Sequence, residues 1–383
     1  MRFQAPLWSS AFRPFFLFGI PFGIFVLMLG WLSAHTGVWA PPPRAGRLWH
    51  GHEMMFGFTA AIISGILLTA LPSWAGTAEI KYGPLALLFF LWLAGRLAPL
   101  LPALPAAILD CALFPVMAVM LAPQLLRVKN KLYLLVLPGL IGLACANVIF
   151  HVGLATGSEE RAYFGLHLAV YTIFILYLLK SGVMIPVFTS NELRKRPAGG
   201  EISRHAGLEV LAVLSVVALA SADLAALPAA AVGSAASLAC ALNAARLLRW
   251  RGWRVAGAPI VFVMHLGIAW MVLALGLKAA ACFSAAVPKE AWLHAFTVGG
   301  IGLCMTVLMT RVVLRHTGRP LKLPVLIKLA YLLMFAAAML RVAWALFALD
   351  IHVMSTSALL WVLAFLIYLL LFGAMLWRPS LPR

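Results

Sequence analysis

The stretch FFLFGIPFGIFVLMLGWLSA, at residues 15–34, contains no charged side chain. About twenty apolar residues in an α-helix are long enough to cross the hydrocarbon core of a membrane. Eleven similar runs follow, at approximately 48–71, 84–102, 105–124, 131–152, 163–187, 207–226, 228–247, 257–283, 290–312, 324–346 and 357–377. The sequence therefore predicts an all-α protein, a polytopic transmembrane bundle of about twelve helices.

The third and fourth runs meet at three prolines, Pro99, Pro102 and Pro105. Proline removes a backbone donor and interrupts a helix, so we expect a tight hairpin there with short or kinked helices. No soluble segment, long linker or low-complexity tail stands out elsewhere. We expect residues 1–383 to form a single helical-bundle domain.

Composition supports a membrane protein. Of the 383 residues, 64% are hydrophobic and 10% are charged, against about 45–50% and about 25% in an ordinary soluble domain. Lipid must cover the excess apolar surface, so the bilayer is the expected partner. The net charge of +18 does not indicate nucleic-acid binding, because no basic stretch alternates with aromatic residues on a polar surface.

The Lys and Arg residues lie in short clusters between the apolar runs, and mostly in alternate loops. Loops after even-numbered runs carry Lys81, Arg127, Lys129, Lys131, Arg194, Lys195, Arg196, Arg204, Arg246, Arg249, Arg251, Arg254, Arg311, Arg315, Arg319, Lys322 and Lys328. Loops after odd-numbered runs carry only Arg44, Arg47, Arg161 and Lys289. Further arginines, Arg2, Arg13, Arg378 and Arg383, stand near the ends of the chain. By the positive-inside rule, both termini are predicted to be cytoplasmic.

Five histidines fall near the outer ends of four predicted helices: His50, His52, His151, His167 and His294. A single histidine there is more often an interfacial or hydrogen-bonded core residue. Five at one level of the membrane favour a metal or haem site, because neutral imidazole is a common ligand of transition metals and of haem iron.

His50 and His52 are two residues apart, so on a regular helix they point about 200° away from each other. They cannot chelate one ion there, but they could serve two centres on opposite sides of the helix. The adjacent Glu53 could bind a metal, carry protons or orient a histidine, and it could also simply be solvated.

His265 is deeper, and is either an axial haem ligand or a hydrogen-bonded core residue. His316 at a helix end is either a cap or a ligand. The remaining histidines, in or near loops, are expected to be exposed: His35, His205 and His352. Cys111, Cys145, Cys240, Cys282 and Cys304 form no C-x-x-C or C-x-x-C-H motif, so covalent c-type haem is excluded and thiolate clusters are not expected.

Several motifs, in order along nearly the whole chain, resemble the NnrS family. They are Phe12-Arg13-Pro14-Phe15-Phe16, Trp49-His50-x-His52-Glu53-Met54-x-Phe56-Gly57, Pro186-Val187-Phe188-Thr189, Leu293-His294-Ala295-Phe296-Thr297-Val298-Gly299, Thr310-Arg311 and His316-Thr317-Gly318-Arg319-Pro320-Leu321. The chain departs from the family pattern at Ala75, Val183 and Arg315, where Thr, Arg and Gly are expected.

The resemblance implies a multi-pass bacterial inner-membrane protein that contains haem b and copper, with iron possible at the second metal, and that is linked to nitric oxide and denitrification stress. Carried onto matched positions, it implies cofactor-binding roles for His50, His52, His167, His265 and His294. Metal-binding roles are implied for His50, His52, His151, His167 and His294, and Glu53 is the candidate catalytic residue.

Three functions fit these expectations. A nitric oxide reductase-like enzyme would join two NO molecules using two electrons, from quinol or another donor, and two protons, which Glu53 could deliver. Alternatively, a non-catalytic haem protein would bind, sense or buffer NO. A transporter fits less well, because the polar residues gather at one membrane face rather than at the midplane. No carboxylate lies midway through the inner half, so protons would arrive more easily from outside.

Overall fold

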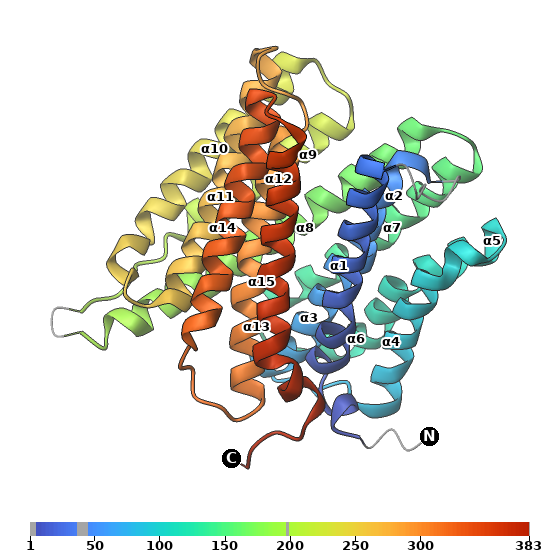
Figure 1. Ribbon diagram of the computed structural model, residues 1–383. Coiled ribbons are helices and arrows are strands. Elements are labelled where there is room, and N and C mark those ends of the chain that lie inside the picture. Colours follow the sequence, from blue (N-terminus) through green and yellow to red (C-terminus); the bar gives the residue numbers. More distant parts are fainter. Residues whose placement is uncertain (1–4, 37–44, 197–198, 383) are drawn as a thin grey trace. The chain divides into compact units, whose positions relative to one another are not determined.

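The protein is described by a computed structural model that covers residues 5–36, 45–196 and 199–382 (Figure 1). The terminal and loop arginines Arg2, Arg44 and Arg383, and the side chain of Arg47, lie outside this description. Within it, the chain is all-helical and contains no strand. Twelve helices are long and apolar enough to cross a membrane, which confirms the predicted fold class.

The twelve spans agree closely with the predicted runs. They are Phe12–Ser33, Trp49–Ala75, Tyr82–Leu100, Ala103–Arg127, Lys131–Ala155, Glu159–Leu193, Ala206–Leu224, Ala229–Arg249, Pro259–Phe283, Ala291–His316, Val325–Phe347 and Ile351–Trp377.

The differences lie at the ends of the elements. The fourth span is broken at Ala112 into α5 (Ala103–Cys111) and α6 (Leu113–Arg127). Both helices are short, as predicted, but the break lies beyond the three prolines of the hairpin. The sixth, α8 (Glu159–Leu193), is longer than predicted. The last, α15 (Ile351–Trp377), begins several residues earlier, so His352 is exposed on a helical first turn rather than in a loop.

Contacts between residues divide the chain into two compact units. Unit 1 comprises residues 1–173, 308–322 and 368–383, and unit 2 comprises residues 174–307 and 323–367. Three helices, α8, α13 (Gly302–His316) and α15, are divided between the two units, with one part of each helix in unit 1 and the other part in unit 2. That both units belong to a single domain stays a prediction.

Unit 1 brings the two ends of the chain together (Figure 1). Its other helices are α1 (Phe12–Thr36), α2 (Trp49–His52), η3 (Glu53–Thr59), α3 (Ala60–Ala75), α4 (Tyr82–Leu97), α5, α6 and α7 (Val136–Ala155). The buried Arg13 in the first turn of α1 donates hydrogen bonds to the backbone oxygens of Met375, Leu376 and Arg378, and to Oγ of Ser380. A cation at a helix C-terminus satisfies carbonyls that have no partner within the helix. Arg13 therefore fixes both ends of the chain at the same end of unit 1, as an even number of spans requires.

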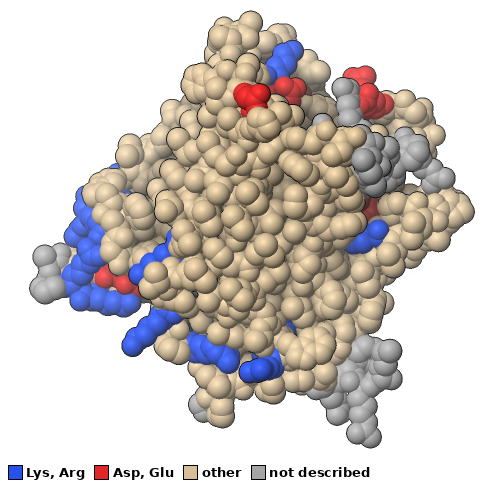
Figure 2. All heavy atoms as spheres, viewed as in Figure 1, with Lys and Arg blue, Asp and Glu red and all other residues tan. Residues whose placement is uncertain are grey.

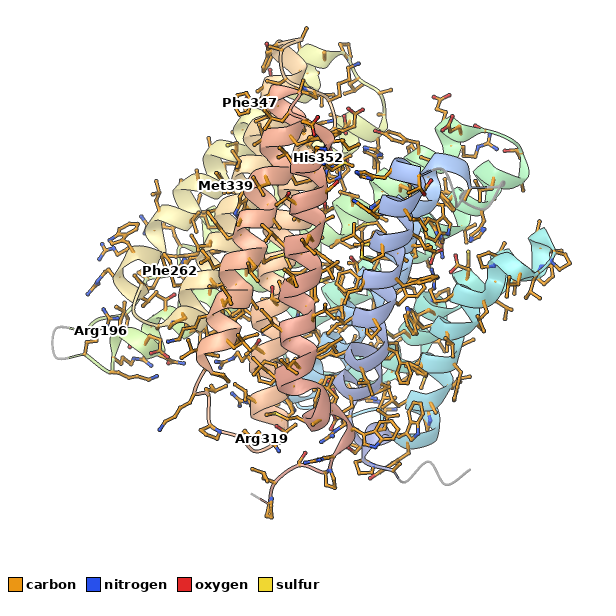
Figure 3. The ribbon with its side chains drawn as sticks, in the orientation of Figure 1. Arg196, Phe262, Arg319, Met339, Phe347 and His352 are labelled. Carbon is orange, nitrogen blue, oxygen red and sulfur yellow. The ribbon has the colours of Figure 1, made fainter. Side chains whose placement is uncertain are left out.

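Unit 2 contains α9 (Ala206–Leu224), α10 (Ala229–Arg249), η6 (Gly252–Val255), α11 (Pro259–Phe283), α12 (Ala291–His294), η7 (Ala295–Ile301) and α14 (Val325–Phe347). Within this unit, Figure 3 places Arg196 at one end and Phe347 and His352 at the other, with Phe262 and Met339 between them. The basic loop between α8 and α9 thus lies at the opposite end from the loop between α14 and α15.

Two spans contain a seven-residue π-helical segment. In each, a short α-helix ends at a histidine, His52 or His294, and the segments η3 and η7 begin at the next residue. A π-helix widens the turn and is frequent at functional sites. These two spans are also the most buried of the twelve.

The charged side chains are distributed as expected for a membrane protein. Over the helices, the face drawn in Figure 2 is almost entirely uncharged, and the basic and acidic side chains gather near the helix ends. This distribution matches a surface that meets lipid along the helices and water at their ends.

A substitution at Gly165 of α8 would test how closely α7 packs against α8. A Cβ added at Gly165 would lie 2.6 Å from the carbonyl oxygen of Ala146 and 2.7 Å from the backbone nitrogen of Phe150. Because backbone cannot easily move aside, we expect Gly165→Ala to destabilise the protein by about 1–3 kcal/mol. Thermal unfolding of the purified protein, followed by tryptophan fluorescence, measures this loss.

The matched control is Gly373 in α15, where an added Cβ meets nothing within 4 Å. Gly373→Ala should leave stability unchanged or raise it by about 0.5–1 kcal/mol, because alanine favours a helix. Equal effects of the two substitutions would contradict the packing described here.

Candidate metal centre

Four consecutive spans place polar side chains at one buried position in unit 1. His52 ends α2 and Glu53 begins η3, Arg96 comes from the last turn of α4, and Asp110 comes from α5. On α7, Asn147 and His151 lie one turn apart, so both face the same side. These positions share the end of unit 1 that is away from the chain termini.

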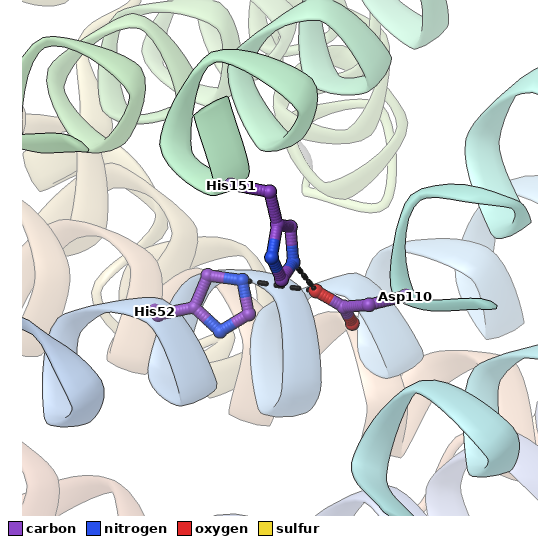
Figure 4. A group of neighbouring side chains, drawn as sticks. All are labelled: His52, Asp110 and His151. Atoms are coloured by element: carbon purple, nitrogen blue, oxygen red, sulfur yellow. Dashed lines mark hydrogen bonds and ion pairs between the residues drawn. The ribbon is translucent and has the colours of Figure 1, made fainter. Parts of the chain in front are cut away.

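Three of these residues could hold a metal ion (Figure 4). His52, Asp110 and His151 each offer one ligand atom, and these atoms lie within 4.8 Å of one another. The Oδ2 atom of Asp110 lies 3.1 Å from Nε2 of His52 and 2.7 Å from Nε2 of His151. His52 and Asp110 are buried, and His151 is partly exposed.

The donor set fits a transition metal. Two imidazole nitrogens and one carboxylate oxygen suit copper, iron or zinc, and three protein ligands leave a position open for a small molecule. Ligands about 2.0–2.2 Å from a tetrahedral ion are roughly 3.4 Å apart. The observed separations of 3.1 and 2.7 Å are shorter, so the side chains would have to move apart to admit an ion.

The guanidinium of Arg96 holds the two carboxylates of the site. Its Nη1 donates to Oε2 of Glu53 and its Nη2 donates to Oδ1 of Asp110, and all three side chains are buried. The neighbouring Gly95 makes this possible, because an added Cβ would lie 3.1 Å from Cα of Asp110. Glycine thus lets α5 approach α4 closely enough for the ion pair to form.

The His52 ring is fixed on every side. Its Nδ1 faces Oε1 of Glu53 at 3.0 Å, and its Nε2 faces Oδ1 of Asn147 at 2.9 Å as well as Asp110. The Phe150 ring stacks on it, with centroids 4.2 Å apart. A carboxylate on the far nitrogen of a metal-binding histidine orients the ring and raises its basicity, which is the position that Glu53 occupies.

The charges of the site do not balance without a further cation. Two carboxylates, Glu53 and Asp110, face one guanidinium, Arg96, and uncompensated charge is costly in a buried site. Because both nitrogens of His52 face acceptors, a doubly protonated imidazole can supply the missing charge. A metal ion beside Nε2 would supply it as well.

The other predicted histidines of unit 1 lie outside this group. His50 lies beside Gly30 of α1, where an added Cβ would be 3.3 Å from its Nδ1. His167 donates from Nδ1 to the carbonyl oxygen of Tyr163 at 3.1 Å, and its ring packs on the Tyr163 ring. The structure thus separates His50 from His52, as their spacing predicted.

His265 and His294 belong to unit 2, and each is engaged through Nε2. The Thr189 hydroxyl donates to the Ile185 carbonyl, so it accepts from Nε2 of His265 at 2.9 Å. Arg341 donates to Nε2 of His294 at 2.9 Å. Haem ligation through either Nε2 would require its partner to be displaced, so these contacts do not by themselves fit axial haem ligands. The geometry of His265 is that of a hydrogen-bonded core histidine.

The prediction that five imidazoles converge on one level spans both units and stays a prediction. The sequence patterns assigned no role to Arg96, Asp110 or Asn147. One signal could have found all three: each is a lone polar or charged residue within an apolar span, which is costly in lipid and usually faces a bundle interior.

Comparison with known proteins agrees with the resemblance found in the sequence. The model of the NnrS protein family matches residues 6–380. A search of curated proteins found no match. The family is associated with nitric oxide and with metal or haem binding, and a group of two histidines and an aspartate in unit 1 could bind a metal. This chain, a multi-pass membrane protein related to nitric oxide, belongs to the NnrS family.

Proposed function

We propose that this protein binds nitric oxide at a metal centre formed by His52, Asp110 and His151, and reduces it to nitrous oxide. The observation that supports the proposal is the cluster of these three metal-ligating side chains. It offers three ligand atoms in a membrane protein whose family is related to nitric oxide.

The ligand types suit copper, iron or zinc, and the proposed reduction of nitric oxide requires a redox-active metal, which favours copper or iron. Such an ion supplies a Lewis-acidic, redox-active centre that binds nitric oxide. The overall reaction would join two NO molecules with two electrons and two protons to give nitrous oxide and water. The electrons would come from a quinol or another external donor.

The protein's own residues would orient the ligands and hold protons. Asp110 contacts both imidazoles, so it fixes the distance between them. Glu53 contacts His52 and Arg96, and a proton held between Glu53 Oε1 and His52 Nδ1 would lie next to the centre. We propose Glu53 as the residue through which protons reach the site.

Haem b is a further proposed cofactor, and it rests on the family alone. The proposed haem-binding residues are His50, His52, His167, His265 and His294, and ligation through Nε2 of His265 or His294 would have to displace Thr189 or Arg341. A metal role is also proposed for His50, His167 and His294. A visible spectrum of the purified protein tests for haem directly.

We also propose that the protein lies in the bacterial inner membrane with both termini cytoplasmic, which puts the metal centre toward the outer face. The basic loops after even-numbered spans support this orientation. Fusions of alkaline phosphatase to the C-terminus should be inactive, and fusions within the loop that contains Lys289 should be active. The reverse pattern would contradict the orientation.

Substitution of the ligands should remove the metal. We expect His151→Ala and Asp110→Asn each to lower metal affinity at least about tenfold, because each removes a donor atom. Elemental analysis of the purified variants at a fixed free-metal concentration measures this, with thermal unfolding recorded on the same samples.

The control is the pair Asp350 and His352, a histidine and a carboxylate that are exposed and 3.8 Å apart. His352→Ala should retain the metal of the unsubstituted protein. Full metal content in His151→Ala and Asp110→Asn, with both variants folded, would rule out this site.

A substitution of Glu53 should lower the turnover of NO more than it lowers the metal content of the protein. Glu53→Gln keeps the size of the side chain but cannot carry a proton as a carboxylic acid, so we expect NO consumption to fall about 10²–10⁴-fold. Anaerobic NO consumption with a reduced quinol measures this, and the metal content should fall far less than the turnover.

Two results would change the proposal. Parallel losses of metal and activity in Glu53→Gln would make Glu53 a residue that only positions His52. NO binding without consumption in the unsubstituted, metal-loaded protein would instead favour the alternative function, a protein that binds, senses or buffers NO.

A further inference from the structure

A second polar site lies in unit 2, outside the group described above. A half-open pocket of about 440 Å³ lies between α12 and the last turns of α14. Most of its wall is apolar, and its polar lining comes from Glu290, His294 and Arg341 beside the Trp344 ring. It lies toward the end of unit 2 that Phe347 and His352 mark in Figure 3.

Arg341 differs in its partners from three other buried arginines of the spans, of which Arg13 donates to four oxygen atoms at the end of α15. Arg96 pairs with two carboxylates, and Arg246 pairs with Glu209 at 3.3 Å. Among the residues that the structure describes, Arg341 forms no ion pair with a carboxylate. Its Nη2 donates to His294, its guanidinium lies 4.7 Å from the Trp344 ring centroid, and its Nη1 is buried without a hydrogen-bond partner in the described part of the chain.

A guanidinium without an anion is unfavourable in this position. Arginine stays protonated in proteins, so it cannot become neutral to avoid the cost of burial. Neither a neutral imidazole nor an aromatic ring cancels a full positive charge. Glu290 lines the same pocket but is exposed, and it forms no ion pair with Arg341. The missing component of the site is therefore a negative charge.

We propose that this pocket binds an amphiphile with one anionic oxygen-containing head group. The head group pairs with the guanidinium of Arg341, in the forked geometry that arginine offers to a carboxylate or a phosphate. The apolar body lies along Trp344, Ala345 and Leu349. Glu290 at the same pocket disfavours a second negative charge on the ligand.

Octanoate is the probe, and octanol is the neutral control of the same chain length. Equilibrium dialysis uses the full chain in phosphatidylcholine nanodiscs. Octanoate should bind at least about tenfold more tightly than octanol, because a charge-assisted hydrogen bond strengthens binding by that factor or more.

Three variants separate charge from folding. Arg341→Gln should weaken octanoate binding at least about tenfold. Arg341→Lys keeps the positive charge, so its affinity for octanoate should fall less than that of Arg341→Gln. Glu290→Gln should bind octanoate a few-fold more tightly, because it removes a like charge. The exposed neighbour Lys289 is the control, and Lys289→Gln should change little, because exposed charges are screened.

A competition experiment with an anionic lipid distinguishes the two possible sources of the anion. If phosphatidylglycerol in the nanodisc competes with octanoate, the natural occupant is an anionic lipid, and if it does not, the occupant is a soluble carboxylate. Either result supports the site. Octanoate that fails to bind, binds no better than octanol, or binds Arg341→Gln unchanged would overturn it. None of these measurements depends on metal or on nitric oxide.

Discussion

The guanidinium of Arg96 lies between the carboxylates of Glu53 and Asp110, and the other contacts of the candidate metal centre depend on this placement. Without Arg96, two buried carboxylates would face each other, and breaking a buried ion pair costs about 3–5 kcal/mol. With it, Glu53 is held against Nδ1 of His52 and Asp110 is held against both imidazoles. One cation therefore fixes four side chains from three more spans. The arrangement needs one more positive charge, which either a doubly protonated His52 or a metal ion can provide.

The π-helical segments η3 and η7 extend this account to both units. In η3, Glu53 begins the wider turn directly after His52, and the carbonyl of Gly57 accepts a hydrogen bond from the Trp92 indole at 2.9 Å. In η7 the same local structure follows His294, whose Nε2 faces Arg341. Each unit thus has a buried span in which a histidine comes immediately before a widened turn. Such segments are costly and persist where tertiary contacts hold them.

Much of this could be predicted from the sequence, because the bilayer limits a spanning segment to a helix of about twenty apolar residues. The twelve spans, the short helices beside the prolines at 99, 102 and 105, and the separation of His50 from His52 follow from length, proline content and helix geometry. The residues that gather around His52 and Glu53 could not be predicted, since Arg96, Asp110 and Asn147 lie on three other spans, and their contacts depend on how those helices pack. The π-helical segments left no periodic signal in the sequence, and Arg341 resembled any lone charge near a helix end.

X-ray absorption at the edge of the metal that co-purifies with the protein tests the centre most directly. Loaded protein should show nitrogen and oxygen ligands at about 2.0–2.2 Å, with the outer-shell scattering that two imidazoles produce. His52→Ala should reduce that scattering to one imidazole. Sulfur ligands at about 2.3 Å, or an imidazole contribution unchanged in His52→Ala, would contradict a centre built from His52, Asp110 and His151.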